Sequence, residues 1–358
     1  EKLATLEGGR GGTVTSSGHA AETLVLFPLM APGMEVIVSN KLYGGTINLM
    51  GKSFRKFGWN AVFVDNDNPE AFRAAVTEKT RAIFVESLAN PGGVIVDLEA
   101  IAKIAQEAEV PLIVDNTMAT PWLCRPFEWG ADLVVHSTTK FLSGQGNAMG
   151  GIVIDSGRFP WFGNAKYPSL SEPCPDYNGL TFAETFGDMA FTLYSHAVSL
   201  RDLGCTQSPM NAWITLNGVE TLPLRMERHV ENAQKVAGFL QQHPSVEWVS
   251  YAGLSSSPYY QLAQKYLQGK AGSVFTFGIR GGYESGLRLL EKVELFSHVS
   301  NIGDSRSLIL HPASTTHRQL SDEQRLTAGA GPEVIRLSVG IESAEDLIAD
   351  LEQALEGL

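Results

Sequence analysis

Short apolar runs alternate with amphipathic stretches over the first 160 residues of the chain. The runs are almost continuous in Val, Ile, Leu and Phe, which is typical of strands buried on both faces of a sheet. They lie at residues 36–39, 61–65, 82–86, 111–116, 131–137 and 151–155. The stretches between them have helical spacing and lie at residues 20–30, 46–57, 69–77 and 98–109. Strand and helix in alternation predict an α/β fold with a mostly parallel sheet covered by helices on both faces.

The second half of the chain has a different pattern. A Pro-, Gly- and aromatic-rich segment over residues 159–180 predicts a long loop, and residues 182–203 and 211–237 predict long helices. Separated strands are then expected at residues 246–251, 273–279, 307–310 and 334–339, with helices at 285–292 and 344–357. We therefore expect a large domain over residues 1–221 and a smaller α/β domain over residues 222–358.

Composition and charge narrow the function classes. The chain has 358 residues, 27 basic and 39 acidic side chains, and a net charge of −12, with no cluster of Lys and Arg. Nucleic acid and anionic membrane surfaces are therefore unexpected partners. The longest apolar stretch, residues 24–34, is interrupted by Pro28 and Pro32 and is too short to span a membrane, so we expect a soluble protein.

The three cysteines, Cys124, Cys174 and Cys205, are odd in number and widely spaced. Their spacing matches neither a zinc site nor a disulfide framework, which predicts a reducing, cytoplasmic setting and no metal.

Lys140 follows a buried strand in the segment VVHSTTK over residues 134–140. An ammonium is costly to desolvate, so a lysine at this place is typical of a Schiff-base lysine whose amine has a lowered pKa. Ser137 and Thr139 beside it are suited to bind a phosphate. Taken alone, the segment would be interpreted as an exposed lysine on a loop after a strand.

Asp115 ends the preceding apolar strand, LIVDNT. In parallel sheets the ligand lies beyond the carboxyl ends of the strands, so Asp115 and Lys140 are expected to face one ligand. A carboxylate there suits the pyridinium nitrogen of pyridoxal phosphate, although a helix cap or an ion pair would also explain it. Gly18, in the turn SSGH that opens the helix at residue 20, lets backbone amides approach an anion.

Gly18, Asp115 and Lys140 lie in three of seven segments that together resemble the Cys/Met-metabolism family of pyridoxal-phosphate enzymes. Members of this family have fold type I, which is the fold of the aminotransferases. The resemblance runs through the whole chain. Its segments are SSGHAA (16–21), LYGGT (42–46), ESLANPGG (86–93), VDNTMATP (114–121), HSTTKFLSGQGN (136–147), HPASTTH (311–317) and RLSVGIE (336–342). Within the family, SLRDLG (199–204), LRMERHVENA (224–233) and AGAGPEVIRLSVGIE (328–342) are most similar to the O-acetylhomoserine sulfhydrylases.

The resemblance implies a cofactor, pyridoxal 5'-phosphate, and a set of residues that hold it. Lys140 would form the Schiff base and Asp115 would pair with the pyridinium nitrogen. Tyr43 would stack on the ring and assist Lys140 in catalysis. The remaining contacts implied are Asn90 near the ring hydroxyl, Thr117 beside Asp115, and Gly18, His19, Ser137 and Thr139 on the phosphate.

The resemblance also implies how the substrate is bound. Arg336 would take the substrate carboxylate as a bidentate fork, for which Arg is better shaped than Lys. Asn90 and Ser307 would contact the same carboxylate. Without the resemblance, Tyr43 would be read as a core aromatic, Asn90 as a turn former and Arg336 as one half of a surface ion pair.

Two departures from the family pattern stand out. Family members carry several dozen residues before the position of Glu1, including a Tyr/Arg pair that reaches the phosphate of a neighbouring subunit. The chain instead opens in what reads as the end of a helix and without Met, so we expect that its beginning is missing. Arg306 stands where the γ-lyases and cystathionine synthases of the family typically carry Glu, which suits an enzyme that does not use cysteine as its second substrate.

The activity implied is γ-replacement on an O-acylhomoserine in methionine biosynthesis, with sulfide as the nucleophile and homocysteine as the product. The assembly implied is a homotetramer built from dimers. Two alternatives remain at this stage: a γ-elimination lyase of the same family, and an assembly subunit that has kept the fold and lost the chemistry.

Overall fold

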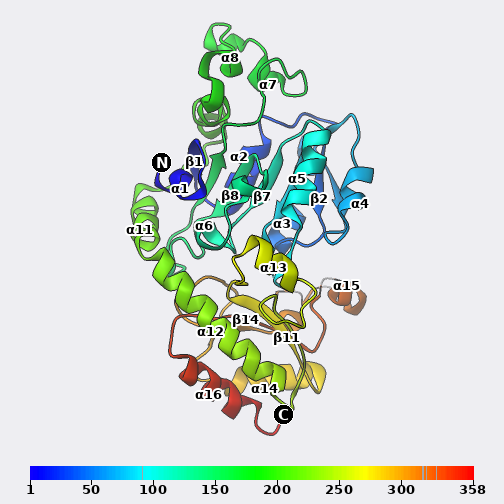
Figure 1. Ribbon diagram of the computed structural model, residues 1–358, viewed down its shortest axis with the longest axis vertical. Coiled ribbons are helices and arrows are strands. Elements are labelled where there is room, and N and C mark those ends of the chain that lie inside the picture. The colour runs from blue at the N-terminus through cyan, green and yellow to red at the C-terminus, as the bar shows by residue number, and fades with distance from the viewer. Residues whose placement is uncertain (91, 317, 320, 328) are drawn as a thin grey trace. The chain divides into compact units, whose positions relative to one another are not determined.

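The computed structural model describes residues 1–90, 92–316, 318–319, 321–327 and 329–358 (Figure 1). Pro91, His317 and Ala328, which belong to three of the segments that carry the family resemblance, lie outside the described residues. None of the described helices combines the length and the apolar character needed to cross a membrane.

A seven-stranded sheet organises the first part of the chain. Its strands follow the order β1-β9-β8-β7-β4-β2-β3. The five strands from β8 to β3 are mutually parallel, whereas β9 is antiparallel to both β8 and β1. The mostly parallel sheet is thus confirmed. Its strands are β1 (Gly11–Thr15), β2 (Glu35–Ser39), β3 (Asn60–Val64), β4 (Thr80–Glu86), β7 (Leu112–Asp115), β8 (Leu133–Ser137) and β9 (Gly151–Asp155).

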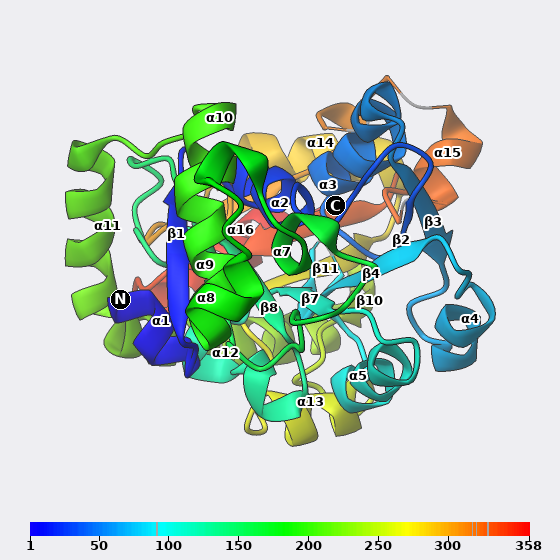
Figure 2. The same cartoon turned by 90° about the horizontal axis from the view of Figure 1, so that it is seen from above.

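Helices cover this sheet because each carries one buried apolar stripe. α2 (Gly18–Leu26) packs on β8 and β9 through Leu24 and Val25, which are fully buried. α5 (Leu98–Glu107) begins at the N-cap Asp97 and buries Ile101 and Ile104. α9 (Ala190–Tyr194) packs against β1 and β9 (Figure 2). The other helices of this part are α1 (Lys2–Glu7), α3 (Gly44–Asn48), α4 (Pro69–Ala74), α6 (Thr120–Leu123), α7 (Pro168–Ser171), α8 (Phe182–Phe186), α10 (Arg201–Leu203) and α11 (Pro209–Glu220).

A five-stranded sheet in the order β10-β11-β14-β13-β12 organises the later part of the chain. All its pairs are antiparallel except β12 with β13. Its strands are β10 (Val246–Ser250), β11 (Val274–Ile279), β12 (Ser297–His298), β13 (Leu308–Leu310) and β14 (Val334–Ser338). Its helices are α12 (Leu222–Gln242), α13 (Tyr260–Tyr266), α14 (Gly282–Lys292), α15 (Asp322–Thr327) and α16 (Ala344–Leu355), and a small hairpin is formed by β5 (Leu88–Ala89) and β6 (Val94–Ile95).

The chain forms two compact units. One comprises residues 1–87, 96–139 and 148–215, and the other residues 88–95, 140–147 and 216–358. Three short segments of the first 221 residues, 88–95, 140–147 and 216–221, therefore belong to the later unit. These units are discontinuous in sequence, so they do not test a division into two consecutive domains. The domain boundary expected between residues 221 and 222 stays a prediction.

Three predicted helices are interrupted. The helix expected over residues 211–237 is two helices, α11 and α12, because Thr221 leaves helical geometry and Pro223 is suited to the first turn of a new helix. The helix expected over residues 46–57 is a short α-helix followed by a π-helical and a 3₁₀ turn. The one expected over 182–203 is similarly divided between α8, α9, α10 and intervening turns.

Candidate functional site

The polar ends of β7 and β8 are joined by a short relay of hydrogen bonds. Asp115 pairs with Val135 in the parallel register of the two strands. The backbone N–H of Thr117 donates to Asp115 Oδ1 over 2.8 Å, and the backbone N–H of Ser137 donates to Thr117 Oγ1 over 2.8 Å. The first unit therefore brings three of the predicted residues together and fixes the Asp115 carboxylate relative to Ser137.

Burial raises the pKa of Asp115 above its ordinary value. The hydrogen bonds from Thr117 and the charges of His136 and His19 act in the opposite direction, because each stabilises the ionised carboxylate. A buried carboxyl group with several compensating neighbours is typical of functional sites.

Glu22 is a second buried carboxyl group near Asp115 that the sequence did not indicate. It lies on α2, is 3% exposed, and accepts a hydrogen bond from Thr46 Oγ1 over 2.7 Å. Burial, reinforced by the charge of Asp115, raises the pKa of Glu22 to about 8, so this side chain is mostly protonated at neutral pH.

The turn before α2 has the geometry of an anion site. Ser17 caps the helix by accepting from Ala20 N over 3.1 Å. A Cβ on Gly18 would lie 2.8 Å from the Cβ of Ser137, so only glycine permits this approach of the turn to the end of β8. The N–H groups of a first helical turn and the positive end of the helix dipole favour a phosphate at this place.

Tyr43 and His19 present an aromatic surface from the same unit. Their rings are stacked, with centroids 5.8 Å apart and an interplanar angle of 29°. The Tyr43 ring is 49% exposed, and its backbone N–H donates to Glu86 Oε1 over 2.6 Å, which anchors the loop to the end of β4. An exposed, anchored ring of this kind can stack on a planar ligand.

Thr139 lies two residues beyond β8 and is held by Gly150. Its hydroxyl donates to Gly150 O over 3.2 Å and accepts from Gly150 N over 3.1 Å. Thr139 is bonded to Lys140 in the chain, so the hydroxyl-rich segment continues directly into the candidate lysine.

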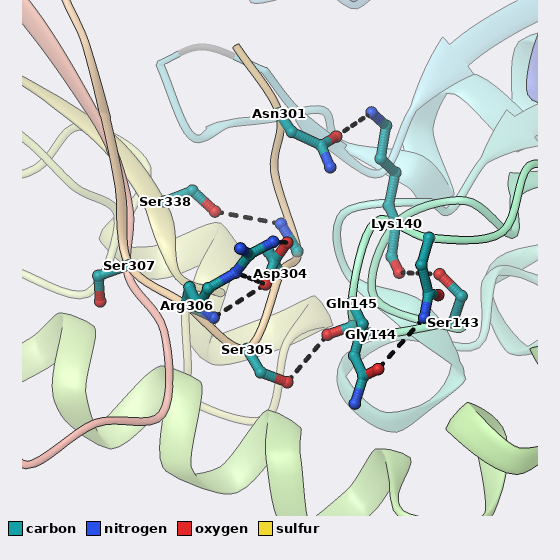
Figure 3. Close-up of polar contacts among 12 residues, drawn as sticks. Lys140, Ser143, Gly144, Gln145, Asn301, Asp304, Ser305, Arg306, Ser307 and Ser338 are labelled. Atoms are coloured by element: carbon teal, nitrogen blue, oxygen red, sulfur yellow. Dashed lines mark hydrogen bonds and ion pairs between the residues drawn. The ribbon is translucent and has the colours of Figure 1, made fainter. Parts of the chain in front are cut away.

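Lys140 belongs to the second compact unit, where its ammonium contacts Asn301. Nζ donates to Asn301 Oδ1 over 2.5 Å, and Figure 3 shows the two side chains pointing toward each other. Burial, reinforced by the positive charge of Arg336, lowers the pKa of Lys140 to about 8. A much larger fraction of the amine than for an ordinary lysine is therefore neutral and nucleophilic near neutral pH, although most of it is still protonated, and this is expected for a Schiff-base lysine.

Arg336 lies at the centre of β14 and joins the predicted Asn90 to Asn301. It pairs with Thr276 of β11 and Leu310 of β13 in the sheet. One guanidinium nitrogen donates to Asn90 Oδ1 over 3.4 Å, and the other terminal nitrogen donates to Asn301 O over 3.1 Å. The second unit therefore brings Lys140, Arg336 and Asn90 together, with Asn301 as a link that the sequence did not indicate.

Ser307 is engaged elsewhere in the second unit. It is fully buried, and its hydroxyl donates to Glu342 Oε2 and accepts from Gly340 N, each over 2.8 Å. In Figure 3 it lies apart from Lys140 and Asn301. Its expected role as a substrate contact stays a prediction. The neighbouring Arg306 side chain is 70% exposed and is bound to Asp304.

Comparison with known proteins identifies the family. The model of the Cys/Met metabolism PLP-dependent enzyme family matches residues 1–356. An O-acetyl-L-homoserine sulfhydrylase of Leptospira meyeri is 48% identical over 367 aligned positions, covering 100% of this chain and 83% of the relative. O-acetyl-L-homoserine sulfhydrylase 1 of Thermus thermophilus is also 48% identical, over 99% of this chain and 85% of its own.

A solved structure agrees with these sequences. A crystal structure of a Campylobacter jejuni protein, provisionally assigned as an O-acetylhomoserine (thiol)-lyase, superposes with a TM-score of 0.96 at 42% identity. The match covers 99% of this chain and 85% of that one, and the Campylobacter structure carries an N'-pyridoxyl-lysine-5'-monophosphate. The fold-type-I expectation is confirmed.

The residues described above fit pyridoxal phosphate. Gly18, whose missing Cβ leaves room beside Ser137, suits the phosphate, and the buried Asp115 suits a pyridine nitrogen. Lys140, with its lowered pKa, suits the aldehyde. On the agreement of family model, relatives and fold, this chain belongs to the Cys/Met metabolism family of enzymes that use pyridoxal phosphate as their cofactor.

Proposed function

We propose that this chain is an O-acetylhomoserine sulfhydrylase, which converts O-acetyl-L-homoserine and sulfide to L-homocysteine and acetate in methionine biosynthesis. In this reaction the bond between Cγ and the acetate oxygen breaks and a bond between Cγ and sulfur forms. One observation carries the proposal: a lysine amine with a pKa of about 8 lies in the same hydrogen-bonded group as an arginine suited to bind a carboxylate. The names of the relatives from Leptospira and Thermus support the choice of substrate.

Lys140 moves the protons in this proposal. Pyridoxal phosphate, when bound, supplies an electron-withdrawing ring that stabilises negative charge on the substrate carbons. The Lys140 amine removes the proton at Cα and returns one later, a task that requires a pKa near the working pH. Asn301, which accepts from Nζ over 2.5 Å, holds the amine while it is free, and Tyr43 assists it.

Arg336 binds and orients the substrate carboxylate. Its guanidinium is already held by Asn90 and by the backbone oxygen of Asn301, so binding the carboxylate costs little further ordering. Asn90 completes the contacts to the same end of the substrate, whereas a contact from Ser307 would require its hydroxyl to leave Glu342 and Gly340. The carboxylate is thereby placed relative to Lys140, which lies in the same hydrogen-bonded group.

The residues of the first unit hold the cofactor. Asp115 would keep the pyridine nitrogen protonated, and Thr117, whose N–H donates to Asp115 Oδ1, orients that carboxylate. Tyr43, with its aromatic ring exposed, would stack on the cofactor ring. Four residues bind the phosphate through backbone amides and hydroxyls: Gly18, His19, Ser137 and Thr139. The covalent continuity of Thr139 with Lys140 supports assigning the two sets of residues to one cofactor.

An assay with O-acetylhomoserine and sulfide tests the proposal. We expect homocysteine and acetate in equal amounts, and we expect Lys140→Ala to lose more than about a hundredfold of the activity, because acid–base catalysis alone is worth about 10²–10⁴-fold. The matched control is Lys235→Ala, which removes an exposed lysine paired with Glu231 and should leave the rate unchanged. O-succinylhomoserine in place of the acetyl ester reports the acyl preference.

Two results would contradict the proposal. Ammonia and 2-oxobutanoate released at the same rate without sulfide would make the chain a γ-elimination lyase. Homocysteine formation no faster than with free pyridoxal phosphate would make it an inactive subunit.

We further propose that the chain assembles as a homotetramer built from dimers. Support comes from α11, where Met210 and Trp213 lie one helical turn apart and are 61% and 62% exposed. Large apolar side chains gathered on one helix face are typical of protein interfaces. Light scattering should give the mass of four chains, and Trp213→Glu should reduce it.

A cytoplasmic location is proposed on the cysteines. Cys124, Cys174 and Cys205 are all free thiols in the described structure, which is the usual state in a reducing compartment. Cell fractionation should find the protein with cytoplasmic markers.

A further inference from the structure

A buried carboxylate from the first helix reaches the ends of the two strands that carry the cofactor residues. Glu7 is the last residue of α1, and Oε1 of its side chain accepts from Asn116 Nδ2 over 2.8 Å. The same oxygen lies 2.5 Å from His136 Nε2, and the side chains of Glu7 and His136 are both fully buried. All three residues belong to the first compact unit.

The two partners of Glu7 directly adjoin residues assigned to the cofactor. Asn116 follows Asp115 at the end of β7, and His136 precedes Ser137 in β8. Since Asp115, Thr117 and Ser137 are linked by hydrogen bonds, one oxygen of Glu7 ties together the strand ends on both sides of that relay. A shift of either strand end would therefore move the Asp115 carboxylate.

Asn116 is itself fixed by several further bonds. Its Nδ2 also donates to the backbone oxygen of Cys124 over 2.8 Å, and its Oδ1 accepts from Ser87 Oγ over 2.7 Å. A fully buried carboxylate is costly unless it is paired and hydrogen-bonded, and Glu7 Oε1 has both Asn116 and His136 as partners. Glu7 Oε2 and His136 Nδ1 are buried without a hydrogen-bond partner in the described part of the chain. Packing alone does not explain why one carboxylate oxygen beside the candidate cofactor site has two polar partners.

Charge supplies that explanation. Two imidazoles, those of His136 and His19, and a second carboxyl group, that of Glu22, interact electrostatically with Asp115. The charge of His136 lowers the pKa of Asp115 and so opposes the effect of burial. Glu7 Oε1, 2.5 Å from His136 Nε2, fixes the imidazole in its buried position beside Asp115.

We propose that Glu7 and His136 are positioning residues for the cofactor, which keep Asp115 ionised and correctly placed against the pyridine nitrogen. The inference rests on the proposed role of Asp115. With Glu7 changed, His136 loses the partner that holds its ring in place, and the influence of His136 on the Asp115 carboxylate is altered. The pyridine nitrogen in turn holds its proton less firmly.

The experiment uses the holoenzyme reconstituted with pyridoxal phosphate labelled with ¹⁵N at the pyridine position. Glu7→Gln keeps an oxygen acceptor for Asn116 and removes the charge, and His136→Gln keeps a donor toward Glu7 and removes the imidazole. The two readouts are the ¹⁵N chemical shift, which reports protonation of the ring nitrogen, and the cofactor dissociation constant. We expect both variants to move the shift toward the unprotonated value and to raise the dissociation constant about tenfold, since a neighbouring charge typically changes a pKa by about one unit or more.

Two controls separate this role from a structural one. His311→Gln removes another fully buried histidine, which is bound to Pro332 O and Ser314 Oγ in the second unit, and should leave both readouts unchanged. Glu7→Asp retains the charge and should retain the wild-type ¹⁵N shift, even if the shorter side chain lowers the thermal midpoint. If Glu7→Gln does not fold, His136→Gln and Glu7→Asp still decide the question.

Asp115→Asn distinguishes failure of this inference from failure of the proposed function. A ¹⁵N shift that moves in Asp115→Asn but stays at the wild-type value in Glu7→Gln and His136→Gln would overturn the positioning role alone. A shift that stays unchanged in Asp115→Asn as well would show that Asp115 is not the partner of the pyridine nitrogen, and would overturn both.

Discussion

Replacing Lys140 by Met in the cofactor-free protein should change how stability depends on pH. The pKa of Lys140 is lowered from 10.5 to about 8 in the folded protein, because the ammonium is largely buried and lies near Arg336. The unfolded chain returns the lysine to its ordinary pKa. At 1.36 kcal/mol for each pH unit, this difference makes the charged Lys140 destabilising by about 3 kcal/mol.

The sign and the pH range follow from proton linkage. Below pH 8 both states hold the proton and the folded state bears the whole penalty. Between pH 8 and 10.5 the unfolded state binds more protons than the folded state, so the free energy of unfolding rises with pH. We expect the free energy of unfolding of the wild type to rise by about 2 kcal/mol of this total between pH 7 and pH 9.5. Lys140→Met has no such group and should not show this gain.

Urea unfolding at pH 7 and pH 9.5, followed by tryptophan fluorescence, measures the effect. The informative quantity is the wild-type free energy of unfolding minus that of Lys140→Met, because every other titrating group contributes to both proteins. The loss of the hydrogen bond to Asn301 offsets part of the gain in the variant, but it does so equally at both pH values. Lys235→Met, an exposed site, should behave as the wild type within about 0.5 kcal/mol. Parallel pH dependence in the wild type and Lys140→Met would refute the argument that Lys140 is buried as an ammonium.

Four further variants, at three positions, test the site under turnover. Arg336→Lys should raise KM for O-acetylhomoserine, and Arg336→Ala should raise it more, by about 10- to 100-fold, because charge-assisted hydrogen bonds to the carboxylate are lost. An unchanged KM in both variants would mean that other residues bind the carboxylate. Asp115→Asn should keep the cofactor bound but slow the exchange of the substrate α-proton with deuterated solvent, whereas a purely structural Asp115 would leave that rate at the wild-type value. Asn301→Ala should lower kcat by about 10- to 100-fold with little change in KM, since the free Lys140 amine loses the partner that positions it. A wild-type kcat would show that Asn301 does not position the amine.

The regular part of the fold was predictable because burial on both faces produces continuous apolar runs. β7 and β8 occupy residues 112–115 and 133–137, within the runs predicted at 111–116 and 131–137. The helix predicted at 98–109 is α5, which begins after the N-cap Asp97. Asp115 and Lys140 stood out for the same physical reason, since charged groups in or just beyond buried strands are costly and seldom occur without a function.

The interrupted helices were not predictable from periodicity. Residues 46–57 keep an apolar spacing close to that of an α-helix, yet the backbone passes through a π-helical turn at Leu49–Ser53 before a 3₁₀ turn. A π-helical turn and a 3₁₀ turn each differ from an α-helical turn by one residue in the spacing of their backbone hydrogen bonds. The spacing of apolar side chains does not resolve so small a difference. Pro223 did mark the break between α11 and α12, and a stricter use of proline as a helix-start signal would have divided that segment.

Asn301 and Glu7 show where sequence reasoning ends. Asn301 meets Lys140 across 161 positions, and Glu7 meets His136 across 129. Each lies at or beyond the end of an element, where no periodic pattern marks it as buried or paired. Lys140 was found because a buried charge carries a local signal, namely a polar residue that follows an apolar run, whereas His136 was not singled out. The group that compensates such a charge needs only to reach it in space, so it carries no signal of its own. A candidate site predicted from sequence will therefore contain the costly charges first, and the residues that make those charges tolerable become visible only in three dimensions.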